Sequence, residues 1–147
     1  PVNDAADLAA VVDGYRARWS IEEYFRALKQ GCAYEKRQLE SKHSLLNALA
    51  VFTPVAWQLL ALRHLSRDGD ATPAGTILAP IKLKILAAHK DTRTMPLATV
   101  RDAMLAIARL GGHIKNNGDP GWIVLGRGFE DLLVMELGAT LALDAKM

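Results

Sequence analysis

Residues 15–29 read Tyr-Arg-Ala-Arg-Trp-Ser-Ile-Glu-Glu-Tyr-Phe-Arg-Ala-Leu-Lys, and this stretch has the hydrophobic period of an α-helix. On a helix that turns about 100° per residue, with Tyr15 set to zero, the apolar side chains from Ile21 to Leu28 fall between about 180° and 280°. The polar side chains fall on a narrow stripe beside them. The stretch therefore predicts an amphipathic helix whose apolar face packs against another part of the fold.

The polar stripe combines a phenol, guanidinium groups, a carboxylate and an ammonium group. Tyr15, Arg18, Glu22, Arg26 and Lys29 fall at about 0°, 300°, 340°, 20° and 320°. The helix rises about 21 Å from the first to the last of them, which is too long for one small anion. A nucleic-acid backbone presents phosphates at intervals along such a length, and arginine, lysine and tyrosine all donate hydrogen bonds to phosphates. The stripe therefore points to a nucleic-acid backbone.

Glu22 is the exception on this stripe, because a carboxylate repels phosphates unless a divalent metal ion lies between them. Carboxylates that hold Mg²⁺ beside a phosphodiester are what two-metal phosphoryl transfer needs. A simpler interpretation stays open. In it, Arg18 and Glu22 form an ordinary i,i+4 ion pair worth roughly a few tenths of a kcal/mol, and Arg26 and Lys29 are solvated charges.

Apolar residues recur at helical spacing through most of the remaining chain. The residues at 77–88 also alternate, which is compatible with a strand, but Ala87 and Ala88 favour a helix. Gly31 and the pair Gly111-Gly112 are predicted helix stops, and Pro54 is expected to kink or split its helix. We predict helices at 4–14, 15–31, 44–64, 77–88, 97–110 and 122–143, with loops or linkers at 34–43, 66–73 and 116–121.

The composition bounds the class of protein. Half of the 147 residues are apolar, which is enough for a core, and the net charge of +2 is only weak support for a polyanionic partner. No run of about 18 apolar residues occurs, so we predict no membrane span. The single Cys32 excludes an internal disulfide and suits a reducing compartment. The start at Pro1 has no initiator Met and no signal-peptide pattern, so we expect the chain to begin inside a longer one.

Two blocks of sequence resemble one family. The spacing Tyr-x2-Arg-x3-Glu-x6-Lys, with the run Arg18-Trp19-x-Ile21-Glu22-Glu23-Tyr24, resembles the signature of the insertion-sequence DDE transposases that include the transposon-five enzyme. Downstream, residues 105–112 (Leu-Ala-Ile-Ala-Arg-Leu-Gly-Gly), followed by Gly121-Trp122 and an amphipathic helix, resemble the family's C-terminal dimerisation region. The resemblance covers nearly the whole chain, although residues 66–96 match only loosely.

The resemblance implies a mainly α chain in two parts. Residues 1–42 would be the helical end of a ribonuclease-H-like catalytic core, and residues 43–147 an α-helical dimerisation domain. Glu22 would be the third catalytic carboxylate, which with two Asp holds two Mg²⁺ or Mn²⁺ ions. Tyr15, Arg18 and Lys29 would contact transposon-end double-stranded DNA, and Arg26 shares their stripe. The resemblance implies a bacterial cytoplasmic protein that cuts and pastes DNA as a homodimer.

The two catalytic Asp of that family should lie on strands, and this chain offers no strand-rich stretch. We interpret Asp4, Asp7 and Asp13 as capping or solvated residues. The chain alone is therefore expected to be an inactive fragment that binds no metal ion. The alternative from a different class is a non-catalytic helical module that binds DNA or a partner protein.

The last helix has a hydrophobic stripe whose role the sequence leaves open, because an intrachain core and a subunit interface would produce the same spacing. The resemblance implies an interface with a second transposase subunit. Gly126, Gly128 and Gly138 each weaken this helix by about 1 kcal/mol relative to alanine, so packing must support it. We interpret Trp19 as a core residue, with a platform on which bases stack as the alternative. The residues assigned to dimerisation are Trp122, Leu125, Phe129, Leu133 and Leu137.

Overall fold

The structure is a computed structural model that describes residues 4–67, 72–114 and 118–145. Within these ranges the chain is helical, and the only β-type pairing is an isolated bridge between Pro73 and Thr99. The predicted mainly α fold class is therefore confirmed. The α-helices are α1 (Ala5–Ala17), α2 (Trp19–Arg26), α3 (Lys42–Leu65), α4 (Pro80–Ala88), α5 (Val100–Leu110) and α6 (Trp122–Asp144); the short turns are η1 (Ala27–Gly31, π-helical), η2 (Tyr34–Lys36, 3₁₀) and η3 (Ala74–Thr76, 3₁₀).

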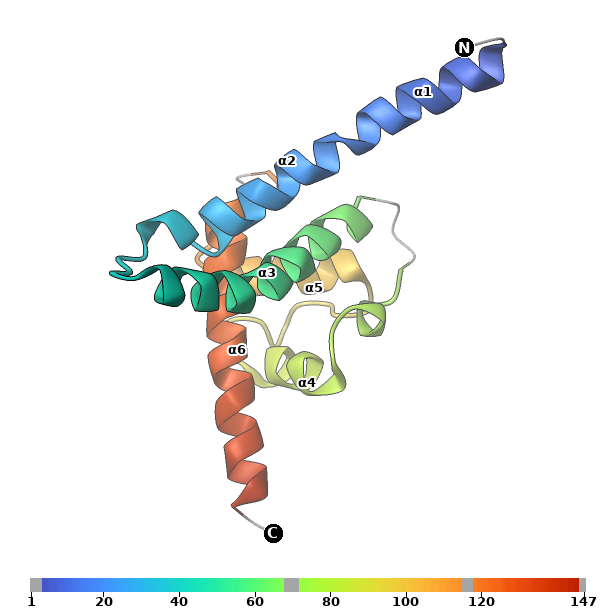
Figure 1. The fold of residues 1–147 in the computed structure, drawn as a ribbon. Coiled ribbons are helices and arrows are strands. Elements are labelled where there is room, and N and C mark those ends of the chain that lie inside the picture. The colour runs from blue at the N-terminus through green and yellow to red at the C-terminus, as the bar shows by residue number, and fades with distance from the viewer. Residues whose placement is uncertain (1–3, 68–71, 115–117, 146–147) are drawn as a thin grey trace.

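Two helical rods project from a packed centre (Figure 1). Helices α1 and α2 follow one another along nearly one line, and we call residues 5–26 the arm. Helices α3, α4 and α5 surround α6, whose C-terminal part continues beyond them in a different direction from the arm. We call residues 133–144 the tail. The predicted linker at 66–73 and the predicted loop at 116–121 each lie partly outside the described residues, at 68–71 and at 116–117.

Capping residues explain where several helices begin. The side chain of Asp4 accepts the backbone N–H of Asp7 at 2.8 Å at the start of α1. Thr99 and Asp102 form a reciprocal capping box at the start of α5, with distances of 3.1 and 3.0 Å. Each such cap stabilises its helix by about 1 kcal/mol. Pro80 occupies the first turn of α4, where its missing N–H costs nothing. The segment 77–88, which the sequence left between helix and strand, is thus helical from Pro80 onward.

Several predicted features of the helix ends differ from the structure. Helix α1 passes through Gly14, and α3 passes through Pro54 as one helix. Gly31 ends a helical segment, but not in the predicted left-handed conformation, which Ala33 adopts instead with φ of +50°. Gly31 is needed for close packing, because an added Cβ would lie 2.9 Å from Leu59 Cδ1. The predicted stop at Gly111-Gly112 is confirmed, and Gly112 has φ of +92°.

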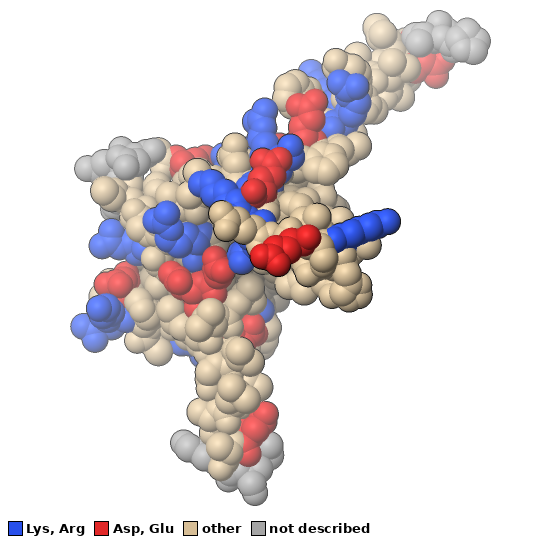
Figure 2. Space-filling view, turned by 60° about the vertical axis from the view of Figure 1, so that its left-hand side comes forward, with Lys and Arg blue, Asp and Glu red and all other residues tan. Residues whose placement is uncertain are grey.

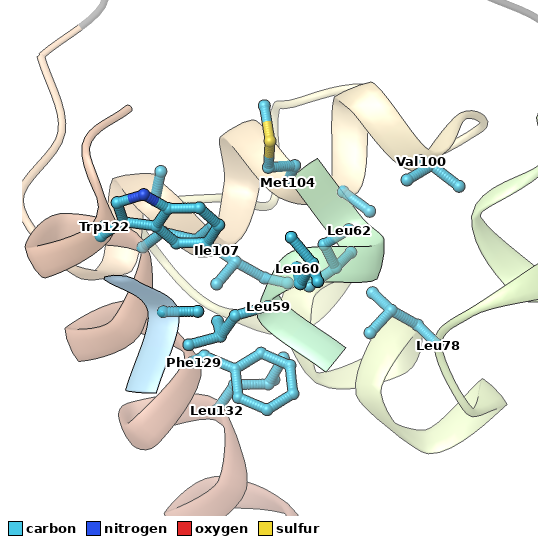
Figure 3. Close-up of a cluster of buried hydrophobic side chains, with 14 of the residues drawn as sticks. Leu59, Leu60, Leu62, Leu78, Val100, Met104, Ile107, Trp122, Phe129 and Leu132 are labelled. Atoms are coloured by element: carbon cyan, nitrogen blue, oxygen red, sulfur yellow. The ribbon is translucent and has the colours of Figure 1, made fainter. Parts of the chain in front are cut away.

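The apolar core lies where α3, α5 and α6 meet (Figure 3). In that view Leu59, Ile107 and Phe129 come from three different helices and point toward one another. Each such side chain stabilises the fold by about 1.5–3 kcal/mol when it is fully buried. Ala27 and Leu28 belong to the same cluster, so the packed unit takes in η1 as well as the helices after residue 42.

Glycines allow α6 to lie directly against its neighbours. A Cβ at Gly126 would overlap the Gly31 carbonyl, and a Cβ at Gly128 would overlap the Ile107 carbonyl. A Cβ at Gly111 would likewise overlap the backbone of Val124. Packing therefore offsets the low helix propensity of these glycines, as the sequence required. Gly138 in the tail has open space around it.

Among the described helices, only α3 is long and apolar enough to cross a membrane by length and composition. The core helix of a soluble protein passes the same test, so this is weak evidence for a span. Leu59, Leu60 and Leu62 of α3 are buried inside the chain's own core. The expectation of no membrane span stays a prediction.

Candidate nucleic-acid interface

The arm is exposed along most of its length, and only Glu23 and Tyr24 of α2 are partly buried. No residue of α1 or α2 is buried, and the side chains of Tyr15 and Trp19 are 64% and 55% exposed. Arginine side chains lie along the projecting arm, interspersed with acidic ones (Figure 2). The interpretation of Trp19 as a core residue is therefore wrong for this structure, because the arm projects away from the elements that could cover it.

The arm is nearly one continuous helix, as the polar stripe requires. Arg18 lies between α1 and α2, where the regular hydrogen-bond pattern of the helix is interrupted. The direction of the backbone is kept, because the φ of −59° and ψ of −30° of Arg18 are right-handed helical values. Its N–H donates to the Tyr15 carbonyl at 3.2 Å, and its own carbonyl accepts the N–H of Ile21 at 3.1 Å. The helical geometry that was expected between Tyr15 and Arg26 is therefore present.

The charged groups of the polar stripe on the arm, Arg18, Glu22 and Arg26, do not pair with one another within the described part of the chain. The Arg18 guanidinium lies over the Tyr15 ring at 5.3 Å from its centroid, a cation–π contact, and makes no ion pair with Glu22. Glu22 and Arg26 are exposed, and neither makes an ion pair or a side-chain hydrogen bond within the described part of the chain. The i,i+4 ion pair between Arg18 and Glu22 that the simpler interpretation assumed is therefore absent, whereas its description of Arg26 as a solvated charge agrees with the structure.

Lys29 lies beyond the regular helix. It belongs to the π-helical turn η1, in which each residue turns less than in an α-helix, so its calculated angle of about 320° does not hold. Its ammonium Nζ lies 2.9 Å from Oε1 of Glu35. The structure therefore places Tyr15, Arg18, Glu22 and Arg26 on one exposed rod, with Lys29 at its base and already paired.

The carboxylates near the arm do not form a metal site. No group of three or more His, Cys, Asp or Glu side chains is placed to hold a metal ion within residues 4–67, 72–114 and 118–145. Asp4 caps α1, and Asp13 lies 3.6 Å from Arg16, as the capping and solvated interpretations expect. Mg²⁺ needs about six oxygen ligands, and Glu22 can supply one carboxylate. The residues described here do not by themselves fit a two-metal centre.

An apolar groove of about 910 Å³ separates the arm from α3. Ile21 and Phe25 line it from α2, and the half-exposed Trp57 lines it from α3. An ion pair of 3.2 Å between Glu23 and Arg67 joins its two sides. The predicted packing of this apolar face is therefore present only in part: Leu28 is buried in the core and Tyr24 packs against it, whereas Ile21 and Phe25 are exposed (Figure 3 shows that core).

The residues assigned to dimerisation divide into two groups. Trp122, Leu125 and Phe129 are buried in the intrachain core, because the glycines of α6 bring this half of the helix against α5 and η1. Their assignment to a subunit interface is therefore corrected to core packing. Leu133 is partly buried, and Leu137 is 61% exposed. The exposed apolar residues of the tail are Val134, Leu137, Leu141 and Leu143.

Several residues that organise this region had no signal in the sequence. Arg37 stacks on the Phe52 ring at 4.1 Å and lies 3.4 Å from Glu130 of α6. Arg63 stacks on Trp122 at 4.6 Å, and burial lowers the pKa of its guanidinium. Each contact joins residues far apart in the chain, so no short-range spacing reports it.

Cys32, the free thiol, lies at the end of η1 and is buried. Burial raises the pKa of this thiol to about 11, an effect that the Arg37 charge opposes and the Glu130 charge reinforces. A thiol with so high a pKa is almost entirely protonated at neutral pH and is a poor nucleophile. The sequence alone indicated a free thiol that is either packed or exposed, and the structure places Cys32 among the buried residues.

No protein-family model matches this chain. The resemblance to the transposase family therefore consists only of the two blocks of residues quoted above. The geometry of the arm is a separate observation that does not rest on this resemblance. It favours a long, negatively charged ligand over a small anion.

Proposed function

We propose that this chain is the C-terminal part of a cut-and-paste DNA transposase, and that the arm contacts the backbone of transposon-end double-stranded DNA. The observation that carries the proposal is the arm itself. It is an exposed helical rod on which Arg18 and Arg26 have no acidic partner among the described residues, and the Tyr15 ring lies against the Arg18 guanidinium. Cations without a partner keep their full charge for phosphates, which dominate the affinity of proteins for DNA.

The length of the stripe supports a backbone ligand over a small anion. Tyr15 and Arg26 are separated by about 17 Å along the helix axis, and double-stranded DNA carries a charge about every 1.7 Å of its own axis. Contacts of this kind hold DNA in register but carry no sequence information. The recognition of a particular transposon end would therefore come from other parts of the protein.

Glu22 is the proposed catalytic carboxylate. It lies on the same rod as the cations and is exposed and unpaired, so it is free to take part in a larger site. Two Asp on a ribonuclease-H-like core outside this chain would complete the ligand set for Mg²⁺ or Mn²⁺, which when bound activate the attacking hydroxyl. The groove beside α2 offers Ile21 and Phe25 as apolar contacts for such a core.

The tail is the proposed contact with a second subunit in the DNA complex. Its exposed residues Val134, Leu137 and Leu141 follow one another at spacings of three and four, so they share one face of α6. A solvent-exposed apolar stripe on a projecting helix is stabilised when a second apolar surface covers it.

A second candidate function is a helical module that binds a partner protein without catalysis. The groove favours it, because the groove is open and lined mainly by apolar side chains, including the half-exposed Trp57. Such a module has no requirement for Glu22.

The first experiment measures binding of this chain to a short random-sequence DNA duplex. We expect R18Q/R26Q to weaken binding at least about tenfold and to lower the slope of log affinity against log salt by about two. The matched control is K84Q/R93Q, which removes two exposed cations away from the arm and should change affinity less than about twofold. Equal weakening by both variants, or no binding by the unchanged chain, contradicts the proposal.

The second experiment separates the two functions at Glu22. In the longer protein that the proposal requires, Glu22→Gln should abolish cleavage of transposon ends while binding to those ends persists or tightens, because a repelling carboxylate is removed. The isostere keeps the size of the side chain, and the site is exposed, so folding is unaffected. Unaltered cleavage in this variant excludes the transposase role of Glu22 and leaves the binding module.

A further inference from the structure

Lys29 differs from the other cations of the stripe because it is already paired. Its Nζ lies 2.9 Å from Oε1 of Glu35, whereas Arg18 and Arg26 contact no carboxylate in the described part of the chain. Both side chains of the pair are about half exposed, so a ligand from solvent can reach them. A phosphate that binds Lys29 therefore competes with the Glu35 carboxylate for the same ammonium group.

The backbone after the arm brings Glu35 back toward Lys29. The chain leaves η1 at Cys32, reverses at Ala33 with a left-handed φ of +50°, and enters the 3₁₀ turn η2. Left-handed conformations cost a non-glycine residue about 1 kcal/mol or more, so the surrounding contacts must hold this reversal in place.

Residues on both sides of Glu35 are anchored. The Tyr34 hydroxyl donates to the Leu45 carbonyl at 3.0 Å. The Arg37 guanidinium stacks on the Phe52 ring and donates to the Cys32 carbonyl at 3.3 Å. Because the backbone of Glu35 is fixed between these anchors, its ion pair with Lys29 loses less conformational entropy than an ordinary surface pair does.

We propose that Glu35 is an internal competitor for the DNA phosphate at Lys29, an autoinhibitory contact within the interface. This inference rests on the proposed function of the arm. In free protein Glu35 holds the ammonium group; in the complex a backbone phosphate takes it, and the ion pair between Lys29 and Glu35 is lost. Affinity is therefore lower than the cations alone would give. Lys29 contributes its full charge to DNA binding only when a phosphate lies close enough to take the place of Glu35.

The test is a double-variant comparison of binding to the same random-sequence duplex. We expect Glu35→Gln to tighten binding about two- to fivefold, the range that corresponds to an exposed ion pair. Lys29→Gln should weaken binding, and K29Q/E35Q should bind as K29Q does, because Glu35 acts through Lys29. The matched control is Glu40→Gln, which removes an exposed carboxylate with no ion pair in the described chain and should have less effect than Glu35→Gln.

The possible results separate the two proposals. If Glu35→Gln tightens binding equally with and without Lys29, the carboxylate repels DNA directly and the competition is overturned. If Glu35→Gln weakens binding, Glu35 holds Lys29 in its binding position and the inference is again overturned. In both cases binding by the unchanged chain and its loss in R18Q/R26Q leave the proposed function standing. A chain that binds no duplex overturns both proposals. Because all substituted side chains are exposed, unchanged circular dichroism is the expected check of folding.

Discussion

The arm and the tail both leave the packed centre as single helices, but they present opposite chemistry. The arm carries arginines, acidic groups and exposed aromatic rings, while the tail is largely uncharged apart from a few acidic side chains (Figure 2). A polyanion matches the first surface, and a second apolar helix matches the second. The difference indicates that the two projections serve different partners.

The two projections also differ in what supports their roots. The arm continues into η1, whose Ala27 and Leu28 are buried, but α2 itself contributes no buried residue. The tail continues the first half of α6, residues 122–132, which packs tightly through Gly126 and Gly128 and which we call the root of the tail. An ion pair of 2.9 Å between Lys82 and Glu136 ties the tail to α4. Changes at the root of the tail should therefore affect stability, and changes on the projections should affect binding.

The largest effect is expected at the root of α6. Gly128→Ala places a Cβ on the Ile107 carbonyl and should lower the free energy of unfolding by about 3 kcal/mol or more, since backbone must move. Gly138→Ala in the open tail should instead raise it by about 0.5–1 kcal/mol through helix propensity. Urea denaturation followed by circular dichroism measures both. Equal effects of the two substitutions would remove the distinction between root and tail.

The next effect concerns the ion pair that ties the tail to α4. Lys82→Met leaves the partly buried Glu136 carboxylate without its counter-ion and should cost about 1–2 kcal/mol of stability. Adding Glu136→Leu should recover most of that loss. Lys84→Met, at an exposed position on the same helix, is the control and should change stability by less than about 0.5 kcal/mol. A similar loss of stability in the Lys84→Met control would show that positive charge on α4 in general, rather than the ion pair between Lys82 and Glu136, stabilises the fold.

A third prediction concerns pairing through the tail. L137D/L141D should weaken self-association on duplex DNA at least about tenfold, because it places charge on the exposed apolar face. Stability should change by less than about 0.5 kcal/mol, because both side chains project into solvent. Sedimentation of the protein with DNA measures the association. Arm variants such as R18Q/R26Q should leave pairing unchanged at DNA concentrations that saturate them, and unchanged pairing in L137D/L141D would exclude the tail as the interface.

The smallest effect is expected for Trp19 on the arm. Trp19→Ser should change the free energy of unfolding by less than about 0.5 kcal/mol, although a buried tryptophan would cost about 3–5 kcal/mol. Chemical denaturation distinguishes the two values clearly. A loss in the larger range would mean that the arm folds back onto the packed centre in solution.

Local patterns in the sequence predicted the helices well and their contacts poorly. The period of apolar residues gave α3, α5 and α6 nearly to their ends, and Gly112 stops α5 as predicted. The spacing of the stripe on α6 could not separate core from surface, and the structure places Phe129 inside and Leu137 outside. The missing information was the contact of α6 with η1 and α5, which joins residues far apart in the chain.

The candidate site shows the same limit. Helical geometry predicted that Tyr15, Arg18, Glu22 and Arg26 share one rod, because this depends only on the local period. The pairing of Lys29 with Glu35 depends on a π-helical turn and on a left-handed alanine, and neither has a recognisable sequence signal. The exposure of Trp19 depends on which elements happen to lie nearby, so hydrophobicity alone assigned it wrongly.

The continuity of α6 through root and tail has a geometric consequence. Gly126 and Gly128 fix the rotation of α6 about its own axis relative to the packed centre. The number of residues between Gly128 and Leu137 therefore sets the direction in which the exposed apolar face of the tail points. One inserted residue would turn that face by about 100° and advance it by about 1.5 Å, while seven would nearly restore its direction and lengthen the rod by about 10 Å. In a dimer that pairs through the tail, helical phase would thus set the dihedral angle between the two arms and the directions from which two DNA ends enter.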